Sequence, residues 1–295
     1  MKLNYYLLDV FTNRKLAGNP LAVVLKADGL TDSRMQAIAA EFNLSETVFV
    51  RSPQDEKLNA ALRIFTPKVE LPFAGHPTVG AAVLLGLLNN LSAVRMELHV
   101  GLVTAVMDKV DKKRGTSRFA LPVLPKEIGA APTADKIAST LGIAPEEIGC
   151  GPYQPAYFSA GTPFYLVPVR GSDVLRKIKL ERRGWSEVYP EGRHSVYVYT
   201  MTPEEKENDI AARMFAPGLG LGEDAATGSA AAALIGKLAE HYDDGLHQIK
   251  LRQGVEMGRP SQISLQFKKE NGVLKHAGIG GMAIIVAEGV LDLSE

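Results

Sequence analysis

Short apolar segments rich in β-branched and aromatic residues alternate with helical patterns along the first half of the chain. Strands are predicted over Tyr5–Val10, Ala22–Leu25, Thr47–Arg51 and Ala61–Thr66. Between them, apolar residues recur at helical spacing over 32–42, and either Thr31 or Asp32 can cap that helix. The alternation of the two patterns predicts a mixed α and β fold.

A second predicted helix, Pro77–Leu88, is built almost wholly of small apolar residues, so it should be buried on all sides. A similar alanine-rich stretch includes Thr227-Gly228-Ser229 and lies 151 residues further on, counted from His76 to Thr227. The turns Gly18-Asn19-Pro20 and Gly161-Thr162-Pro163 are 143 residues apart. Because both separations are close to half the chain, they predict an internal duplication, although such turns and helices also recur by chance.

The polar run Asp108–Ser117 follows strand patterns over Val94–Val110 and is the expected linker between two domains. Two domains also agree with the length of 295 residues, at about 150 residues per domain.

The composition is that of a globular protein, with 46% hydrophobic and 22% charged residues and a formal net charge of zero. A zero charge argues against nucleic acid or an anionic membrane as partner, since both favour a basic face. No apolar stretch approaches the roughly 18 residues of a membrane span, and the N-terminal segment is too short and polar for a signal peptide. We therefore expect a cytoplasmic protein.

A helix buried on all sides must still satisfy the backbone N–H groups of its first turn. These groups also carry a partial positive charge, which favours a carboxylate or an enolate-like anion. The starts of the two alanine-rich helices are therefore candidate parts of an anion pocket, if the duplication brings them to face each other.

The first candidate for chemistry is Glu46, between the end of the helix over 32–42 and the strand Thr47–Arg51. Desolvation there would raise the pKa of its carboxyl group, as acid–base catalysis near neutral pH requires. The alternative is a glutamate of a surface turn or a helix cap.

The second candidate is His76, which follows Gly75 and precedes Pro77 where the helix should begin. Proline is tolerated in the first turn because its missing N–H would have no helical partner. A histidine at this place can donate a hydrogen bond to a substrate or shuttle a proton. The alternative is a side chain that only caps the turn.

The third candidate is the glycine-rich segment 217–231, in which Asp224, Thr227 and Ser229 gather polar atoms at the start of the second helix. It is not a dinucleotide fingerprint, because Glu223 occupies the third glycine position, and it lacks the lysine of a P-loop. The alternative is an ordinary helix cap.

Other site types find no support in the sequence. The six histidines form no His-Glu-x-x-His motif, and the single cysteine, Cys150, excludes both thiolate clusters and an intrachain disulfide. A Gly-x-Ser-x-Gly nucleophile motif is absent. The histidines are His76, His99, His194, His241, His247 and His276.

Taken in order, these segments resemble the phenazine-biosynthesis PhzF-like family from one end of the chain to the other. The matching stretches are Asp9–Thr12 with Ala17–Pro20, Asn43–Thr47, Phe73–Thr78, Gly222–Ala230, and Gly280–Ala283 with Val286–Gly289. One departure is Ala225, where the family usually has proline, and this change should loosen the turn slightly.

The resemblance implies an α+β fold like that of diaminopimelate epimerase, with two pseudo-symmetric domains that each wrap a mixed β-sheet or barrel around one central helix. The N-terminal domain would comprise 1–115 plus about 278–295, and the C-terminal domain 116–277, with the active site in the cleft between them. The resemblance also implies a homodimer.

The implied reaction is an isomerisation by proton transfer, without cofactor or metal, on a small carboxylate-bearing substrate. The family's acid–base glutamate falls on Glu46, and its histidine, aspartate and serine at the helix starts fall on His76, Asp224 and Ser229. We expect the backbone N–H groups at Gly75–His76 and Gly228–Ser229 to bind the substrate carboxylate.

Epimerases and racemases of similar fold use two thiols, one at the start of each central helix. Here those neighbourhoods hold His76 and Thr227, and Cys150 belongs to neither, so that mechanism is excluded. One carboxylate must then move a proton from one carbon to another, which is an allylic shift. The alternative function is a non-catalytic small-carboxylate binding protein or an inactive relative.

Overall fold

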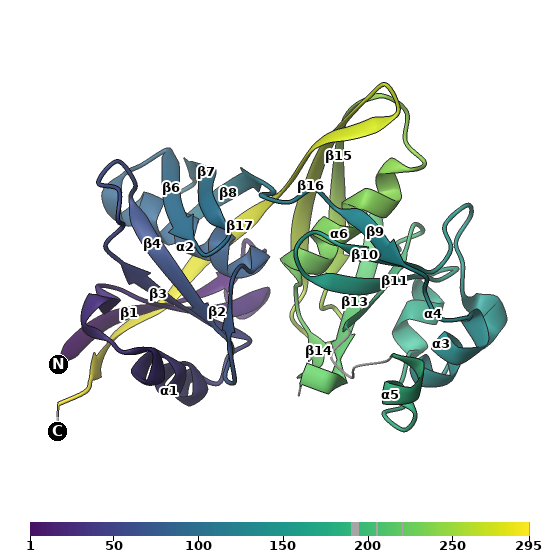
Figure 1. Cartoon of the computed structure of the whole chain (residues 1–295), viewed down its shortest axis with the longest axis horizontal. Coiled ribbons are helices and arrows are strands. Elements are labelled where there is room, and N and C mark those ends of the chain that lie inside the picture. The colour runs from purple at the N-terminus through teal and green to yellow at the C-terminus, as the bar shows by residue number, and fades with distance from the viewer. Residues whose placement is uncertain (190–194, 205, 220, 295) are drawn as a thin grey trace. The chain divides into compact units, whose positions relative to one another are not determined.

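The computed structural model describes residues 1–189, 195–204, 206–219 and 221–294, and these divide into two compact units. The first unit is Met1–Pro122 with Ile279–Glu295, and the second is Val123–Gly278. Strand β17 (Val273–Asp292) begins in the second unit and ends in the first. Figure 1 labels the elements along the chain.

The first unit holds eight further strands and two α-helices. The strands are β1 (Lys2–Val10), β2 (Asn19–Val24), β3 (Glu46–Arg51), β4 (Ala60–Phe65), β5 (Glu70–Leu71), β6 (Ala93–Leu98), β7 (Gly101–Lys109) and β8 (Arg114–Ala120). The helices are α1 (Asp32–Phe42) and α2 (Gly75–Asn89), with a 3₁₀ turn at Ala27–Gly29. The strands and helices predicted before residue 90 are confirmed.

Eight strands of this unit close into a barrel. β1 pairs with β2 and β17, β2 with β3, β3 with β4, β4 with β6, β6 with β7, and β7 with β8. The pairing of β8 with β17 completes the ring. A closed sheet leaves no free edge among its members, so the interior must be filled by side chains or by another element.

That element is α2, which packs against β1, β2, β3, β6, β7 and β8 and lies among these strands in Figure 1. All its residues from Gly75 to Gly86 are buried, so the expected all-round burial of Pro77–Leu88 is confirmed up to Gly86, whereas Leu87 is half-buried and Leu88 is exposed. Close approach to the barrel wall requires Gly80, where a Cβ would lie 2.5 Å from a methyl of Leu21. The helix ends at Asn90 in the left-handed conformation, whose N–H bonds the Gly86 carbonyl.

Helix α1 covers the outside of the barrel. Thr31 caps it by accepting a hydrogen bond from the N–H of Arg34 at 3.3 Å. Its inner face places Met35 and Ile38 against Phe49 and Phe65, in a core separate from the barrel interior. Residues of β3 therefore alternate between two buried faces, with Phe49 directed outward toward α1.

The expected linker Asp108–Ser117 is wrong, because these residues form the hairpin of β7 and β8, with Lys109 paired to Gly115. Asp111 holds the turn by accepting the N–H groups of Lys113 and Arg114, each at 2.8 Å. Hairpin tips are polar because they are solvated and rich in such local bonds. Polarity alone therefore did not mark a domain boundary, and the chain passes between the units at Pro122.

The described residues of the second unit form strands β9 to β16 and four α-helices. The strands are β9 (Lys126–Gly129), β10 (Ala156–Ser159), β11 (Pro163–Pro168), β12 (Ser195–Thr200), β13 (Ile210–Ala216), β14 (Leu221–Asp224), β15 (Gly245–Gln253) and β16 (Ser261–Glu270). The helices are α3 (Ala134–Leu141), α4 (Ser172–Lys177), α5 (Trp185–Val188) and α6 (Gly228–Ala239), with 3₁₀ turns at Pro145–Glu147 and Pro217–Leu219.

Strand pairing in the second unit repeats that of the first. The order β10–β11, β11–β12, β12–β13, β13–β14, β13–β15 and β15–β16 matches β1–β2, β2–β3, β3–β4, β4–β5, β4–β6 and β6–β7, including which pairs are parallel. Helix α6 occupies the place of α2, between β14 and β15, and ten of its residues are buried. The chain is thus a duplicated α+β fold with one buried helix in each copy.

Candidate active site

Glu46 and His76 come together in the first unit. Glu46 opens β3 and pairs with Leu21 of β2, while His76 is the second residue of α2. The Nδ1 atom of His76 lies 3.3 Å from Oε2 of Glu46. The side chains are only 4% and 17% exposed, and Oε2 is shielded from solvent. The alternative of a surface-turn glutamate therefore does not hold for Glu46.

The imidazole of His76 is neutral at neutral pH. Burial lowers its pKa to about 3, and the nearby carbonyl of Pro20 opposes this shift only in part. The 3.3 Å approach of Nδ1 to the Glu46 carboxyl is therefore a polar contact with a neutral imidazole and not an ion pair between two charges. A neutral imidazole in this position can orient a carboxylate without cancelling its charge.

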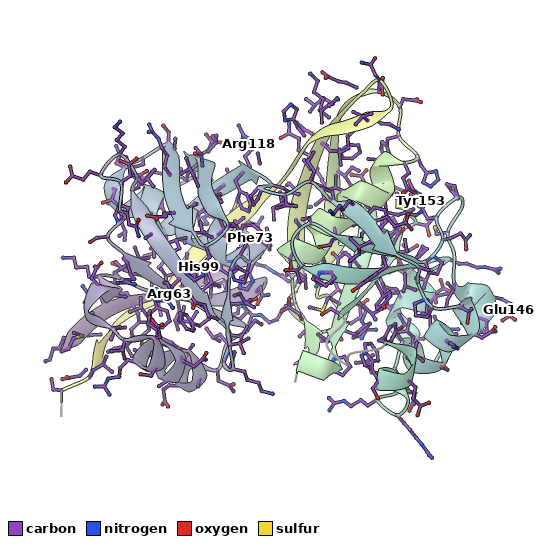
Figure 2. The ribbon with its side chains drawn as sticks, in the orientation of Figure 1. Arg63, Phe73, His99, Arg118, Glu146 and Tyr153 are labelled. Atoms are coloured by element: carbon purple, nitrogen blue, oxygen red, sulfur yellow. The ribbon has the colours of Figure 1, made fainter. Side chains whose placement is uncertain are left out.

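The segment before α2 leads into the helix without a side chain that caps its first turn. Phe73, which Figure 2 labels, packs edge-on against Phe119 of β8, with ring centroids 5.9 Å apart. Ala74 is the N-cap residue, and its carbonyl accepts the hydroxyl of Thr78 at 2.7 Å. The N–H groups of Gly75 and His76 belong to the first turn, which has no intrahelical acceptors. The buried start of α2 is therefore suited to an anion.

A second polar cluster lies in the other unit, at the start of α6. The hydroxyl of Thr227, the N-cap residue, donates to Oδ2 of Asp224 at 2.6 Å. It makes no side-chain cap on α6, so the helix-cap alternative does not hold for Thr227. Asp224, Thr227 and Gly228 are buried and Ser229 is half-buried. The N–H groups of Gly228 and Ser229 lie in the first turn of α6.

Gln253 organises this second cluster, and the sequence reasoning missed it. Its side chain is 1% exposed. Nε2 donates to the Asp224 carbonyl at 2.8 Å and to the Thr227 hydroxyl at 3.1 Å, while Oε1 accepts the Thr227 N–H at 3.1 Å and the Tyr197 hydroxyl at 3.0 Å. The sequence did contain a signal for Gln253: it lies two residues after the apolar Leu251 on the same strand, which places its polar side chain on the buried face.

The internal repeat shows that the two clusters are chemically different. Glu46 pairs with Leu21 as Ser195 pairs with Phe164, so Ser195 occupies the place of Glu46 in the second unit. The second residue of α6 is Ser229, where α2 has His76. A list of the equivalent pairs therefore reads Glu46 with Ser195, His76 with Ser229, Leu71 with Asp224, and Ala74 with Thr227. The duplication repeats the scaffold and not the carboxylate–imidazole pair.

Two residues named from the sequence, His194 and Gly220 of the glycine-rich segment, lie outside the described residues. Within residues 1–189, 195–204, 206–219 and 221–294, three or more His, Cys, Asp and Glu side chains are nowhere grouped so as to hold a metal ion. In that same part of the chain, none of the helices combines the length and the apolar character needed to span a bilayer.

The family model for phenazine biosynthesis-like proteins, PhzC-PhzF, matches residues 8–289. An uncharacterised isomerase of Mesorhizobium japonicum is 44% identical over 298 residues, which is 98% of each chain. The trans-2,3-dihydro-3-hydroxyanthranilate isomerase of Pseudomonas aeruginosa is 32% identical and covers 97% of this chain and 98% of its own.

Solved structures agree with these matches. A PhzF-family phenazine biosynthesis protein of Bacillus anthracis superposes with a TM-score of 0.89 at 25% identity, over 99% of this chain and all of that one. A hydroxyproline epimerase of Agrobacterium vitis, 13% identical, has a TM-score of 0.62 over 100% of this chain and 93% of its own. That second likeness concerns the fold alone and confirms the epimerase-like architecture.

Proposed function

Because this chain belongs to the phenazine biosynthesis-like PhzC-PhzF family and is an isomerase, we propose that Glu46 transfers a proton between two carbon atoms of a small carboxylate-bearing substrate. The observation that carries the proposal is the contact between Glu46 Oε2 and His76 Nδ1 in a buried setting. A carboxylate held this way is oriented by its partner and largely screened from bulk water, as a general base that must return its proton needs to be.

The proposed reaction has two proton steps. The Glu46 carboxylate takes a proton from an activated carbon, and the electron pair left behind spreads through an adjacent unsaturated or carboxyl system. The protonated Glu46 then gives the proton to a different carbon of that system, so the double bond has moved and the composition is unchanged. Fixed hydrogen-bond donors near the developing charge lower the barrier because they need no reorganisation.

A single carboxylate suits this allylic shift better than inversion at one centre. Inversion by two bases needs an acid–base group in each repeat, but the place of Glu46 is taken by Ser195 in the second unit. The single cysteine also excludes a pair of thiols. The asymmetry of the duplicated scaffold therefore favours one group that removes the proton and returns it.

The helix starts are the proposed anchors for the substrate. Each helix start is a proposed anion site, formed by the backbone N–H groups of Gly75–His76 in the first unit and of Gly228–Ser229 in the second, because partial positive charge there favours a substrate carboxylate. Asp224 presents carboxyl oxygens at such a turn, so it suits a substrate amine or hydroxyl that donates to it. Ser229 would fix the orientation.

These preferences describe a substrate class. A small acid that carries both a carboxylate and a hydrogen-bond donor, next to an unsaturated system, satisfies the anchors and the base together. The Pseudomonas aeruginosa relative is named for trans-2,3-dihydro-3-hydroxyanthranilate, an acid of this class. We therefore place that acid first in a panel of small cyclic and amino-acid carboxylates.

The test is solvent deuterium incorporation by the full-length protein in D₂O, followed by mass spectrometry of each acid in the panel. Glu46→Gln keeps the size and polarity of the side chain but cannot take a proton, so turnover should fall by at least about 10²-fold. Glu41→Gln, on the exposed face of α1, is the matched control and should exchange like the parent.

Two outcomes contradict the proposal. A folded Glu46→Gln protein with parental exchange would remove Glu46 from the mechanism. Calorimetric binding of an acid by the parent protein, with neither exchange nor product for any acid of the panel, would favour the binding-protein alternative.

A further inference from the structure

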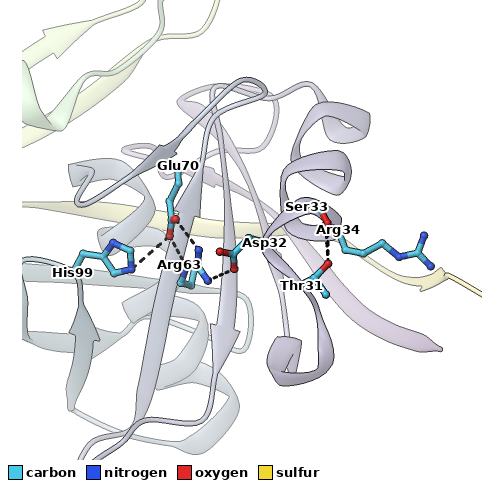
Figure 3. Close-up of polar contacts among 7 residues, drawn as sticks. All are labelled: Thr31, Asp32, Ser33, Arg34, Arg63, Glu70 and His99. Carbon is cyan, nitrogen blue, oxygen red and sulfur yellow. Dashed lines mark hydrogen bonds and ion pairs between the residues drawn. The ribbon is translucent and has the colours of Figure 1, made fainter.

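Arg63 joins three elements of the first unit (Figure 3). Its Nε and Nη2 atoms form a two-pronged ion pair with Glu70 of β5, with Nη2 at 2.7 Å from Oε2. The remaining Nη1 donates to Asp32, the first residue of α1, at 2.8 Å. The guanidinium also lies over the ring of Phe65, 5.3 Å from its centroid. His99 approaches Glu70 at 3.6 Å.

Arg213 makes the corresponding set of contacts in the second unit. Nε and Nη2 each lie 2.8 Å from an oxygen of Glu223 on β14. Nη1 donates to the carbonyls of Leu175 and Ile178 at 2.8 and 3.3 Å, at the C-terminal end of α4. The guanidinium lies 4.9 Å from the centroid of Phe215. Its side chain is only 9% exposed.

The internal repeat makes these two sets equivalent. Phe65 pairs with Glu70 in the register of β4 and β5, and Phe215 pairs with Glu223 in that of β13 and β14. Each arginine precedes its phenylalanine by two residues, on the same strand face. The Arg–Phe–Glu trio is therefore retained in both copies, although the groups proposed for catalysis and substrate binding differ between them.

The arginine of each trio binds the glutamate of the strand that precedes a central helix, β5 before α2 and β14 before α6. Glu70 lies six residues before His76, and Glu223 immediately precedes Asp224. The third donor of each arginine anchors that strand to an outer helix, α1 or α4. A planar guanidinium that binds both carboxylate oxygens fixes orientation as well as distance.

We propose that the pairs Arg63–Glu70 and Arg213–Glu223 are positioning pairs, which hold His76 and Asp224 in the geometry that the reaction needs. This inference rests on the proposed function. Stability alone is a poor reason for both pairs, since a buried ion pair replaced by apolar groups of similar size is often neutral or stabilising. Misplacement of a reacting group by about 1 Å can cost about 10²-fold in rate.

The first experiment needs no substrate. Amide hydrogen exchange of the full-length protein is followed by mass spectrometry in Glu223→Gln and Glu70→Gln. Exchange should accelerate over 224–231 in the first variant and over 71–78 in the second, at least about 10-fold, with the other segment unchanged. Glu204→Gln, from the exposed Arg176–Glu204 pair, is the control and should change neither segment.

The second experiment separates positioning from stability. The double variant Arg213→Met/Glu223→Leu leaves no unpaired buried charge, so it should fold, but it removes the donor to the Leu175 and Ile178 carbonyls, so its kcat/KM is measured well below its melting temperature. Its kcat/KM should nevertheless fall about 10- to 100-fold in the deuterium assay, on the acid of the panel that the parent exchanges fastest. The single variant Arg213→Lys keeps the positive charge but cannot bind both Glu223 oxygens in the same plane, so its kcat/KM should also stay below that of the parent.

The inference is overturned if exchange rises uniformly across a unit, or stays parental over 224–231 and 71–78. It is equally overturned if the double variant keeps parental kcat/KM. Hydrogen exchange decides the positioning role even where no acid is turned over, so its failure is distinct from failure of the Glu46 proposal.

Discussion

The Nδ1 atom of His76 lies 3.3 Å from the Oε2 atom of Glu46, which joins the second residue of a central helix to the first residue of a barrel strand. Thirty positions of sequence separate the two residues. Closure of the barrel around α2 brings them together, and burial keeps the imidazole neutral.

The pH dependence of folding should reveal the buried imidazole of His76. Its folded pKa, about 3, is below the usual value of 6.5, so the unfolded chain binds more protons between these values. The free energy of unfolding should therefore fall as pH drops below 6.5, by about 1.5 kcal/mol from this group between pH 6.5 and 5. Urea unfolding followed by circular dichroism measures the loss.

The control for that measurement is His76→Gln, which cannot titrate. Its free energy of unfolding should change less than that of the parent over the same pH range, by the contribution assigned to His76. Equal slopes for both proteins would mean that the imidazole is protonated in the folded state, and the neutral imidazole beside Glu46 would have to be abandoned.

The hydroxyl of Thr227 should matter for Asp224. Thr227→Val removes the donor that lies 2.6 Å from Asp224 Oδ2 while keeping the shape of the side chain. Loss of a hydrogen bond to a charged group costs about 1.5–3 kcal/mol, so kcat/KM in the deuterium assay should fall about 10- to 100-fold. Thr227→Ser keeps the hydroxyl and should stay near the parent; similar rates for both variants would speak against this role.

Gln253→Met should destabilise the second unit. The change removes the hydrogen bonds that Gln253 makes with the Thr227 N–H, the Tyr197 hydroxyl and the Asp224 carbonyl. We expect a loss of about 2–4 kcal/mol in the free energy of unfolding. The single tryptophan, Trp185, is buried in the core of this unit and reports its unfolding by fluorescence.

Gln248→Met is the matched control for Gln253→Met, because Gln248 is exposed on the same strand. It should unfold within about 0.5 kcal/mol of the parent. If both methionine variants unfolded alike, the hydrogen-bond network around Gln253 would contribute no stability of its own.

Gly18→Ala should disturb the turn before Asn19 and Pro20. Gly18 has φ +68°, and a Cβ there would lie 2.3 Å from the Val10 carbonyl oxygen. Left-handed strain alone costs about 1–2 kcal/mol, and the overlap adds to it, so the total should exceed about 2 kcal/mol. Gly101→Ala, at φ +108° with open space, isolates the strain, and a loss as large as that of Gly18→Ala would contradict the steric argument.

Local patterns predicted much of the fold. The helical spacing over 32–42 and its cap at Thr31 were readable because both depend on neighbours within one or two turns. The uniform apolar character of α2 implied burial on all sides, which the barrel provides. The polar run Asp108–Ser117 misled because a solvated hairpin tip and a linker have the same composition.

The candidate site, like the fold, was predictable from the sequence only in part. Chain order marked Glu46, His76 and Asp224 as polar residues beside apolar elements, but only the barrel makes the first two neighbours, since their contact crosses from β3 to α2. Gln253 was missed because its role depends on its hydrogen-bond partners. These come from β12, β14 and the turn before α6, which are distant from it in the sequence.

Composition and periodicity thus predicted the element types and the duplicated order, because these follow from short-range sterics and burial. The role of Glu46 as base came from the resemblance to the family and stays a proposal. The register of the repeats decided the rest. It placed a serine at the position in the second unit that is equivalent to Glu46, a neutral imidazole beside Glu46, and a two-pronged Arg–Glu ion pair next to the strand that precedes each central helix. Pairing across strands acts between residues that the chain itself keeps far apart, so the sequence alone did not show these contacts.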